Sequence, residues 1–359
     1  MLLLAQSDVE QILTAFGSDG VMDRIIERLT EGLAEVHAGR AAMSPTRDGF
    51  LRSHPVPGII EWMPHRVDGA STTIKTVSYS PANPQQFGLP TIAATVAQFD
   101  DVTGQPTALC DGALLTAMRT GAASAIATRV LSAPGSGTVG VIGTGAQAVT
   151  QLHALSRVMP IERVLAWDVC RAHLLSYTDR VAFLNLKVEE ATPEEVGKFA
   201  DVIVTATSVG AGAGPVFEDV GLADHVHVNA VGADLVGKVE LPRSLLLRAT
   251  VCADHPEQAL REGECQQLSA NQVHLTLAQI CAEPESAGDS RHGPTVFDST
   301  GVAIEDHITL NVFVELARQA GIGTDVDVDS RTSDPLNPYS LSLPETSSFE
   351  SMRGFAPVR

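Results

Sequence analysis

One segment of the chain has the spacing that binds phosphate through its backbone: Gly143-Thr144-Gly145-Ala146-Gln147-Ala148. It follows the apolar run 138–142 and precedes helix-forming sequence, which is the strand, turn and helix order of a dinucleotide-binding unit. Gly143 permits the tight turn, Gly145 lets the pyrophosphate approach, and the free N–H groups of the helix attract its charge. The segment therefore predicts a dinucleotide site; a glycine turn that binds no cofactor is the alternative.

The residue that ends the next expected strand discriminates between the two nicotinamide dinucleotides. Asp168 closes the strand expected at 163–168, where a carboxylate bonds a ribose 2′-hydroxyl and repels a 2′-phosphate. NAD is therefore favoured over NADP. A flavin is disfavoured because such flavoproteins carry the motif at their N-terminus, whereas about 137 residues precede it here.

Several charged residues lie where an unpaired charge is costly or chemically useful. Lys75 falls in a Thr- and Val-rich strand, and Arg119 falls in an Ala-rich helix expected from Asp111 to Leu131. Arg47 lies in a loop, where a solvated surface charge is an equal alternative. Asp234 follows an apolar strand, at the end where parallel sheets place ligands, and could accept a proton. Its alternative role is to cap the following turn.

Composition excludes several classes of function. The net charge of −19 disfavours nucleic acid and anionic membranes, because both require clustered Lys and Arg. No apolar run approaches the roughly 20 residues of a membrane span, so a cytoplasmic protein is expected. The five cysteines form no C-x-x-C pair, and His225 and His227 alternate within an apolar run with no third ligand nearby. We therefore expect no metal site.

The helix and strand patterns predict an α/β protein of two interleaved domains. Residues 1–132 begin with mostly helical sequence and continue, from Val56 to Phe99, as the short runs of an antiparallel sheet. Residues 133–302 alternate strands and helices, as in a parallel Rossmann sheet, with strands expected at 138–143, 163–168, 187–191, 201–207, 225–231 and 249–254. A helix within 303–324 returns to the first domain, and 325–359 form a polar surface tail.

Six ordered blocks of the sequence resemble the ornithine cyclodeaminase and μ-crystallin family, and within it the actinobacterial lysine cyclodeaminases. The blocks are residues 56–64, 75–81, 118–122, 229–234, 262–267 and 297–301. The resemblance implies an NAD-binding Rossmann domain inserted in an α+β substrate and dimerisation domain, and a homodimer. It also implies a lyase in which NAD takes hydride from the α-carbon of a diamino acid and later returns it. L-Lysine would give pipecolate and ammonia; L-ornithine, the alternative substrate, would give proline. An imine or opine-type NAD(P)H dehydrogenase is a further alternative.

The resemblance also assigns roles to individual residues. Asp234 and Glu61 match catalytic acids; for Glu61, an outward-facing strand position is a serious alternative because Ile60 and Trp62 alternate around it. The residues that match the substrate site are Arg47, Lys75, Arg119 and Thr300. Those that match the cofactor site are Thr91, Gly143, Gly145, Ala146, Gln147, Asp168, Thr207, Asn229, Ala230, Val231, Gly232, Lys238 and Ser299. A non-catalytic binding protein of the same family is disfavoured, because Asp234, Arg119 and Lys75 are all present.

Overall fold

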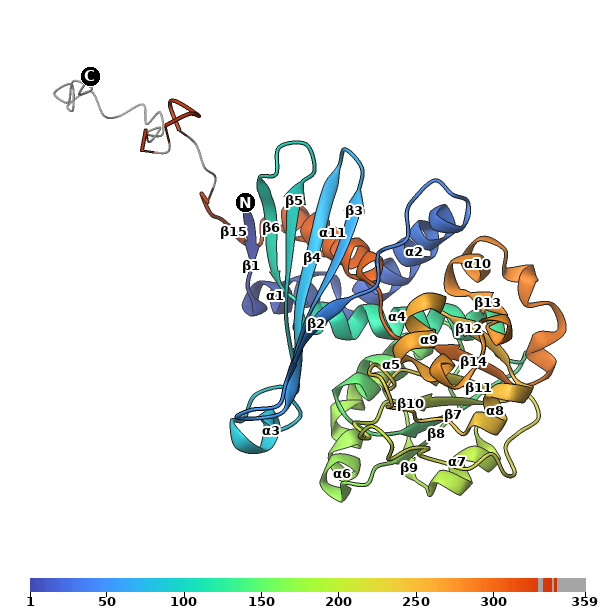
Figure 1. Cartoon of the computed structure of the whole chain (residues 1–359). Coiled ribbons are helices and arrows are strands. Elements are labelled where there is room, and N and C mark those ends of the chain that lie inside the picture. The colour runs from blue at the N-terminus through green and yellow to red at the C-terminus, as the bar shows by residue number, and fades with distance from the viewer. Residues whose placement is uncertain (329–331, 338, 341–359) are drawn as a thin grey trace.

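The computed structural model describes residues 1–328, 332–337 and 339–340. It contains two separate sheets, one antiparallel over most of its width and one parallel (Figure 1). This confirms the predicted α/β fold class. In the described part of the chain, no helix is long and apolar enough to cross a membrane.

The first sheet has seven strands in the order β15-β1-β6-β5-β4-β3-β2. Its central strands form an antiparallel meander, as the Ile-, Val- and Thr-rich runs predicted. The bounds are β1 Leu2–Leu4, β2 Asp48–Arg52, β3 Gly58–Val67, β4 Ser71–Tyr79, β5 Ile92–Asp100, β6 Pro106–Asp111 and β15 Thr324–Asp325, with the short helix α3 (Asn83–Gln86) between β4 and β5.

Helices gather on one side of this sheet. In Figure 1, α2 (Ser18–His37) and α11 (Ala303–Ala320) lie behind the strands, and α1 (Gln6–Phe16) lies near its base. Their apolar faces form one core with α4 (Ala113–Leu131). On the other face, Ile60, Thr76 and Thr95 are exposed. The sheet is therefore buried on one side and open on the other.

The second sheet has eight parallel strands in the order β13-β12-β14-β11-β10-β7-β8-β9. The strand order reverses beside β7, the switch point at which such sheets bind ligands. All six expected strands are found, each one or more residues shorter, and β13 and β14 are additional. The bounds are β7 Thr138–Ile142, β8 Arg163–Trp167, β9 Val188–Glu190, β10 Val202–Thr205, β11 His227–Ala230, β12 Thr250–Ala253, β13 Leu275–Thr276 and β14 Thr295–Asp298.

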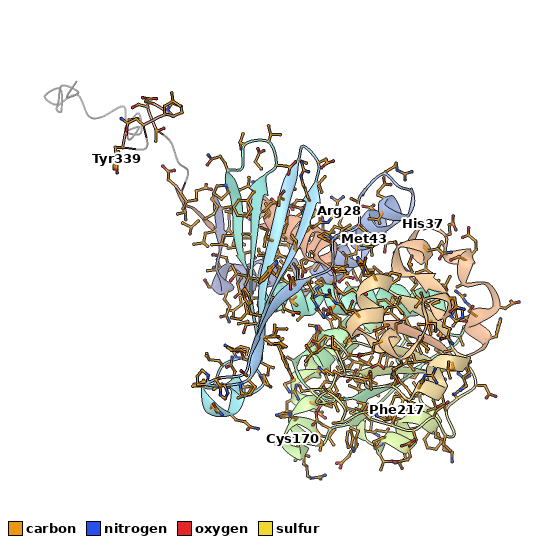
Figure 2. All side chains as sticks on the ribbon, viewed as in Figure 1. Arg28, His37, Met43, Cys170, Phe217 and Tyr339 are labelled. Carbon is orange, nitrogen blue, oxygen red and sulfur yellow. The ribbon has the colours of Figure 1, made fainter. Side chains whose placement is uncertain are left out.

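Helices cover the second sheet and close two further cores. Phe217, labelled in Figure 2, is 5% exposed and belongs to one of them. The helices are α5 Ala146–Ser156, α6 Arg171–Arg180, α7 Pro193–Phe199, α8 Arg243–Arg248, α9 Pro256–Glu262 and α10 Leu277–Ala282. Short 3-10 segments complete the connections, at Ala182–Leu184, Glu264–Gln267, Ala270–Gln272 and Pro284–His292.

Helix α4 joins the two sheets and is buried over most of its length. It packs closely on α5, because a Cβ on Gly121 would lie 2.5 Å from the carbonyl oxygen of Thr150. The helix begins at Ala113 rather than at Asp111, which ends β6 and accepts a hydrogen bond from the N–H of Ala113. Small residues therefore allow α4 to lie between larger elements, as the sequence predicted.

The end of the described chain departs from the expected polar tail in one respect. Asp325, the first residue of that segment, pairs with Leu2 in β15, and Val326 exchanges backbone hydrogen bonds with Met1. Tyr339 is 92% exposed and lies away from both sheets (Figure 2). The N-terminal strand thus pairs with residues 324–326 at the edge of the first sheet, and most of the expected tail lies outside the described residues.

Candidate active site

A cavity of about 350 Å³ lies between the inner face of the first sheet and the carboxyl ends of the parallel strands. Its wall includes apolar residues such as Ile59, Met63 and Val77 and a group of charged side chains. Of the residues predicted from sequence, ten line it: Arg47, Glu61, Lys75, Arg119, Gln147, Val231, Asp234, Lys238, Ser299 and Thr300. The fold thus brings together residues from both halves of the chain.

The register of the first sheet directs Glu61 and Lys75 towards the same face. Lys75 pairs with Met63 across β3 and β4, and Glu61 pairs with Val77, so all four residues lie on the helix-covered side. The Glu61 side chain is 14% exposed. The alternative of an outward-facing Glu61 is therefore wrong. Burial raises the pKa of Glu61, although the Arg47 guanidinium opposes this.

Lys75 and Arg119 form a buried cationic pair at one end of the cavity. Lys75 is 1% exposed and its Nζ lies 2.7 Å from an oxygen of Asp306. Arg119 is 5% exposed and contacts Glu305 at 2.9 Å and Asp306 at 3.1 Å. Burial, together with the nearby Arg119 charge, lowers the pKa of Lys75 to about 8. Both cations can bind a carboxylate in the cavity, while Glu305 and Asp306 compensate their positive charge.

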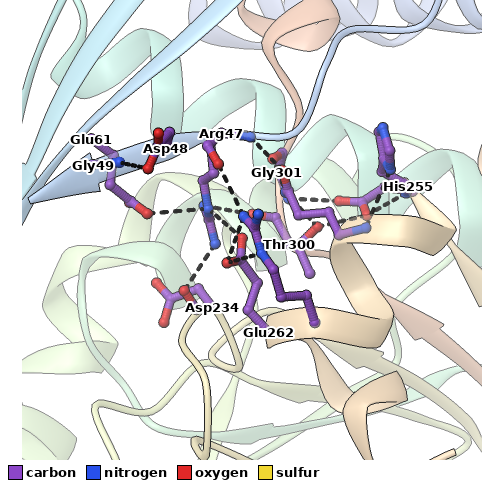
Figure 3. Close-up of polar contacts among 12 residues, drawn as sticks. Arg47, Asp48, Gly49, Glu61, Asp234, His255, Glu262, Thr300 and Gly301 are labelled. Carbon is purple, nitrogen blue, oxygen red and sulfur yellow. Dashed lines mark hydrogen bonds and ion pairs between the residues drawn. The ribbon is translucent and has the colours of Figure 1, made fainter.

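Arg47 crosses from the loop before β2 to the second half of the chain (Figure 3). Its Nε contacts Glu262 at 2.6 Å and Glu61 at 3.3 Å. Its terminal nitrogens donate to the backbone carbonyls of Thr300 and Asp234. Arg47 is only 6% exposed, so the solvated-surface alternative is wrong. Its carboxylate neighbours raise its pKa despite the opposing effect of burial.

Asp234 follows β11 and faces the cavity with a partly solvated carboxylate. One oxygen lies 2.9 Å from Nζ of Lys238, and 37% of the Asp234 side chain is exposed. This pairing, rather than a turn cap, is the contact that the structure shows. Lys238 also lies 5.5 Å above the ring of Tyr79, and Asp234 raises its pKa against the effect of burial. Asp234 is thus held as an acceptor beside Arg47 and Lys238.

The glycine loop has the geometry that its sequence predicted. Gly143 has a φ of +91°, and a Cβ there would lie 2.7 Å from the carbonyl oxygen of Ala206. A Cβ on Gly145 would meet nothing within 4 Å, which leaves room for a pyrophosphate before the first turn of α5. Asp168 accepts from the N–H and hydroxyl of Thr144, and from the N–H of Cys170. The loop therefore fits a dinucleotide, and Asp168 also fixes the loop.

A sequence model described as the ornithine cyclodeaminase/mu-crystallin family matches residues 7–321, which is most of the chain. The chain belongs to the ornithine cyclodeaminase/mu-crystallin family. One relative, an L-lysine cyclodeaminase of Streptomyces rapamycinicus, is 49% identical over 339 residues, covering 94% of this chain and 99% of the relative.

Two solved structures are also similar to this chain. One, described as showing recognition of L-lysine, L-ornithine and L-2,4-diaminobutyric acid by lysine cyclodeaminase, has a TM-score of 0.93 and 56% identity. It covers 95% of this chain and 99% of its own. The other, an archaeal alanine dehydrogenase dimer with bound NAD, has a TM-score of 0.81 and 31% identity, over 92% and 99% of the two chains.

Some residues matched to the family's cofactor site do not line the cavity: Thr91, Gly143, Gly145, Ala146, Asp168, Thr207, Asn229, Ala230 and Gly232. Asn229 is fully buried and donates to Thr128. Thr207 donates to Glu240, which also binds the N–H of Gly232. The side chains of Asn229 and Thr207 are therefore bound to Thr128 and Glu240. The cofactor contacts of all nine residues stay predictions.

The hydroxyl of Thr300 is already occupied. It contacts Asp254 at 2.9 Å and the side-chain amide of Gln258 at 2.8 Å. The hydroxyl therefore donates to one neighbour and accepts from the other. Thr300 borders the cavity, but it fixes the wall rather than presenting a free hydroxyl.

Sequence reasoning missed several residues of this family site. Thr116 lines the cavity one helical turn before Arg119, and its buried hydroxyl has no partner in the structure. Glu262, Glu305 and Asp306 pair with the cavity's cations. The i, i+3 spacing to Arg119 could have indicated Thr116. Among the described residues no cluster of His, Cys, Asp and Glu could hold a metal ion.

Proposed function

We propose that this chain is an NAD-dependent cyclodeaminase that converts L-lysine to L-pipecolate with release of ammonia. The observation that carries the proposal is one cavity with two buried cations, Lys75 and Arg119, and two carboxylates, Glu61 and Asp234. A diamino acid has the complementary charges, one carboxylate and two amines. The similarity to L-lysine cyclodeaminases supports this substrate class.

Different residues of the cavity have different roles in the proposed reaction. Lys75 and Arg119 hold the substrate carboxylate and so orient the α-carbon. Asp234 accepts a proton from the terminal amine as that amine attacks the α-carbon, and Glu61 pairs with the amines. NAD, which the glycine loop would hold, would supply a hydride acceptor for the α-carbon and a hydride donor for the cyclic imine, and the α-amino group would leave as ammonia. The sum is lysine to pipecolate plus ammonia, with no net redox change, which defines a carbon–nitrogen lyase.

L-Ornithine, which would give L-proline, is the second candidate substrate. It differs from lysine by one methylene, which changes discrimination by only about 1–3 kcal/mol. The similarity to the structure described with both amino acids favours keeping ornithine in the test. An NAD(P)H-dependent dehydrogenase is the alternative class, because the archaeal alanine dehydrogenase is 31% identical to this chain.

One experiment separates these possibilities. The purified protein is incubated with catalytic NAD+ and either L-lysine or L-ornithine, and the cyclic product, ammonia and NADH are quantified. We expect equal amounts of pipecolate and ammonia from lysine, with no NADH accumulating. Sustained release of NADH in proportion to substrate would make the protein a dehydrogenase, and faster formation of proline would make ornithine the substrate.

We further propose a cytoplasmic homodimer built on the open face of the first sheet. The register places Ile60, Trp62, Ile74, Thr95 and Ala97 on that face, with the charged Asp111 directly opposite Thr95. A surface with several exposed apolar side chains is typical of an interface. In this proposal, residues 1–132 and the helix in 303–324 serve substrate binding and dimerisation. Residues 133–302 bind NAD, and residues 325–359 form a tail.

The dimer is tested by charge insertion. Thr95→Arg should give monomers in sedimentation velocity, because it buries a cation at the centre of the proposed interface. Thr103→Arg, at the exposed turn after β5, is the matched control and should stay dimeric. A monomeric wild type, or a dimeric Thr95→Arg, would contradict this interface.

A further inference from the structure

The first turn of α11 carries two consecutive carboxylates that do not line the cavity themselves. Glu305 and Asp306 are both 0% exposed, although they lie at the start of an 18-residue helix. Buried carboxylates are costly unless they are paired and hydrogen-bonded. Their partners are the two cations at the substrate end of the cavity, so this helix start is electrostatically part of the site.

Asp306 joins two different elements through its two oxygens. Its Oδ1 lies 3.1 Å from Nε of Arg119 on α4, and its Oδ2 lies 2.7 Å from Nζ of Lys75 on β4. The ion pair of Glu305 is with Arg119, at 2.9 Å. Among the residues that the structure describes, Asp306 is therefore the carboxylate that pairs with both cations, and it comes from a third element, α11.

Asp306 compensates the unfavourable electrostatics of two buried cations that lie close together. Lys75 and Arg119 repel one another, and each loses its hydration on burial. A carboxylate at the N-terminus of α11 is stabilised by the helix dipole and offsets both effects. Nζ of Lys75 lies 2.7 Å from Asp306 but has no hydrogen-bond partner among the described residues, so Lys75 keeps N–H donors for a ligand.

We propose that Asp306 is a positioning residue that keeps Lys75 protonated and holds Lys75 and Arg119 in the geometry that grips the substrate carboxylate. This inference rests on the proposed function and adds a residue that the substrate does not touch. The other charges that act on Lys75 are Arg119 on α4, Arg47 in the loop before β2, and Glu61 on β3.

Asp306→Asn tests the inference, because it keeps the shape and removes the charge. We expect the KM for L-lysine to rise roughly tenfold and kcat to change less, while the Kd for NAD stays within about twofold. Without its counter-charge Lys75 loses its proton at lower pH. The ratio of variant to wild-type kcat/KM should therefore fall from pH 6 to pH 9 by roughly tenfold for each unit by which the Lys75 pKa drops. Taking the ratio cancels the titration of the substrate itself.

Glu315→Gln is the matched control on the same helix, since Glu315 is a surface residue that pairs with Arg24 and Arg28. For Glu315→Gln, the ratio of variant to wild-type kcat/KM should stay at one from pH 6 to pH 9. A flat ratio and an unchanged KM in Asp306→Asn would overturn the proposal, even if the melting temperature falls, because a purely structural carboxylate would behave in that way.

Two further measurements keep the test decisive. If Asp306→Asn does not fold, Asp306→Glu keeps the charge and displaces the carboxylate by one methylene. A KM raised several-fold with a pH-independent ratio then supports the proposal, and an unchanged KM overturns it. Wild-type turnover of L-lysine is measured first. Its absence would refute the proposed function, whereas wild-type turnover together with a flat ratio and an unchanged KM in Asp306→Asn would refute only the role of Asp306.

Discussion

The glycine loop and the cationic end of the cavity both contribute to one site, but they are built in opposite ways. The loop consists of consecutive residues after β7, and Asp168 from the neighbouring strand stabilises it by bonding Thr144. The cationic end takes Lys75 from β4, Arg119 from α4 and its carboxylates from α11, some 190 positions after Arg119. One region is local in sequence and the other depends on the complete fold.

The difference lies in how each region compensates its polar groups. The loop exposes backbone N–H groups and small residues. Keeping these groups accessible to a ligand costs little free energy. The cationic end buries full charges, which are tolerated only as a connected network. We therefore expect changes in the loop to affect cofactor affinity, and changes at the cationic end to affect turnover and stability together.

The largest effect is expected from Arg119→Ala, which should abolish turnover of lysine. It also leaves Glu305 and Asp306 without a main partner, which costs about 3–5 kcal/mol of stability. Arg119→Lys is the matched variant, because it keeps the charge and loses the planar fork. Steady-state kinetics and calorimetric Kd values for NAD decide the outcome. If a folded Arg119→Lys variant failed to bind NAD, the proposed difference between the two regions would be wrong, because a change at the cationic end would then affect cofactor affinity.

A smaller loss is expected from Asp234→Asn, which keeps the shape but cannot accept a proton. Cyclisation should slow by about 10²–10⁴-fold, the usual contribution of a positioned base. NAD affinity should survive, since Asp234→Asn keeps an amide oxygen that can accept from Lys238, the residue matched to the cofactor site. Product formation from lysine and NAD titration provide the two readouts. Normal activity in this variant would remove Asp234 from the proton transfer.

The smallest effect is expected from Asp168→Ala, in the loop region. The Kd for NAD should rise about tenfold, because a hydrogen bond to a charged group contributes about 1.5 kcal/mol. The wild-type preference for NAD over NADP should shrink, because the carboxylate that repels a 2′-phosphate is gone. The kcat at saturating NAD should change little. Equal wild-type affinity for NAD and NADP, measured by calorimetry, would argue against the assignment of Asp168.

The sequence predicted the local region well. The turn at Gly143, the acid at Asp168 and six parallel strands all follow from short-range patterns that the structure retains. Strand β14 was missed because its only apolar residues are Val296 and Phe297, which stand between a Gly-Pro pair and the polar residues from Asp298 onwards.

The long-range region was predicted only in part. Lys75 and Arg119 were recognised because a charge within an apolar segment is unusual. Their partners, Glu305 and Asp306, occupy the first turn of a helix, where carboxylates are common for the dipole alone. Nothing in that local pattern distinguishes a buried ion pair from a solvated helix start. The side chain of Asn229, matched to the cofactor site, lies in the core instead, because its amide bonds Thr128 on α4.

The short connection between β14 and α11 limits how this protein can be recombined with its relatives. Only residues 299–302 separate the last Rossmann strand from the helix that holds the cations. A chimera that exchanges the nucleotide-binding insert would have its second junction inside the wall of the cavity, beside Ser299 and Thr300. The first junction, after α4, is more tolerant because residues 134–135 form an exposed turn. Grafts of the insert therefore need to carry α11 with them, or keep the native residues from Ser299 onwards.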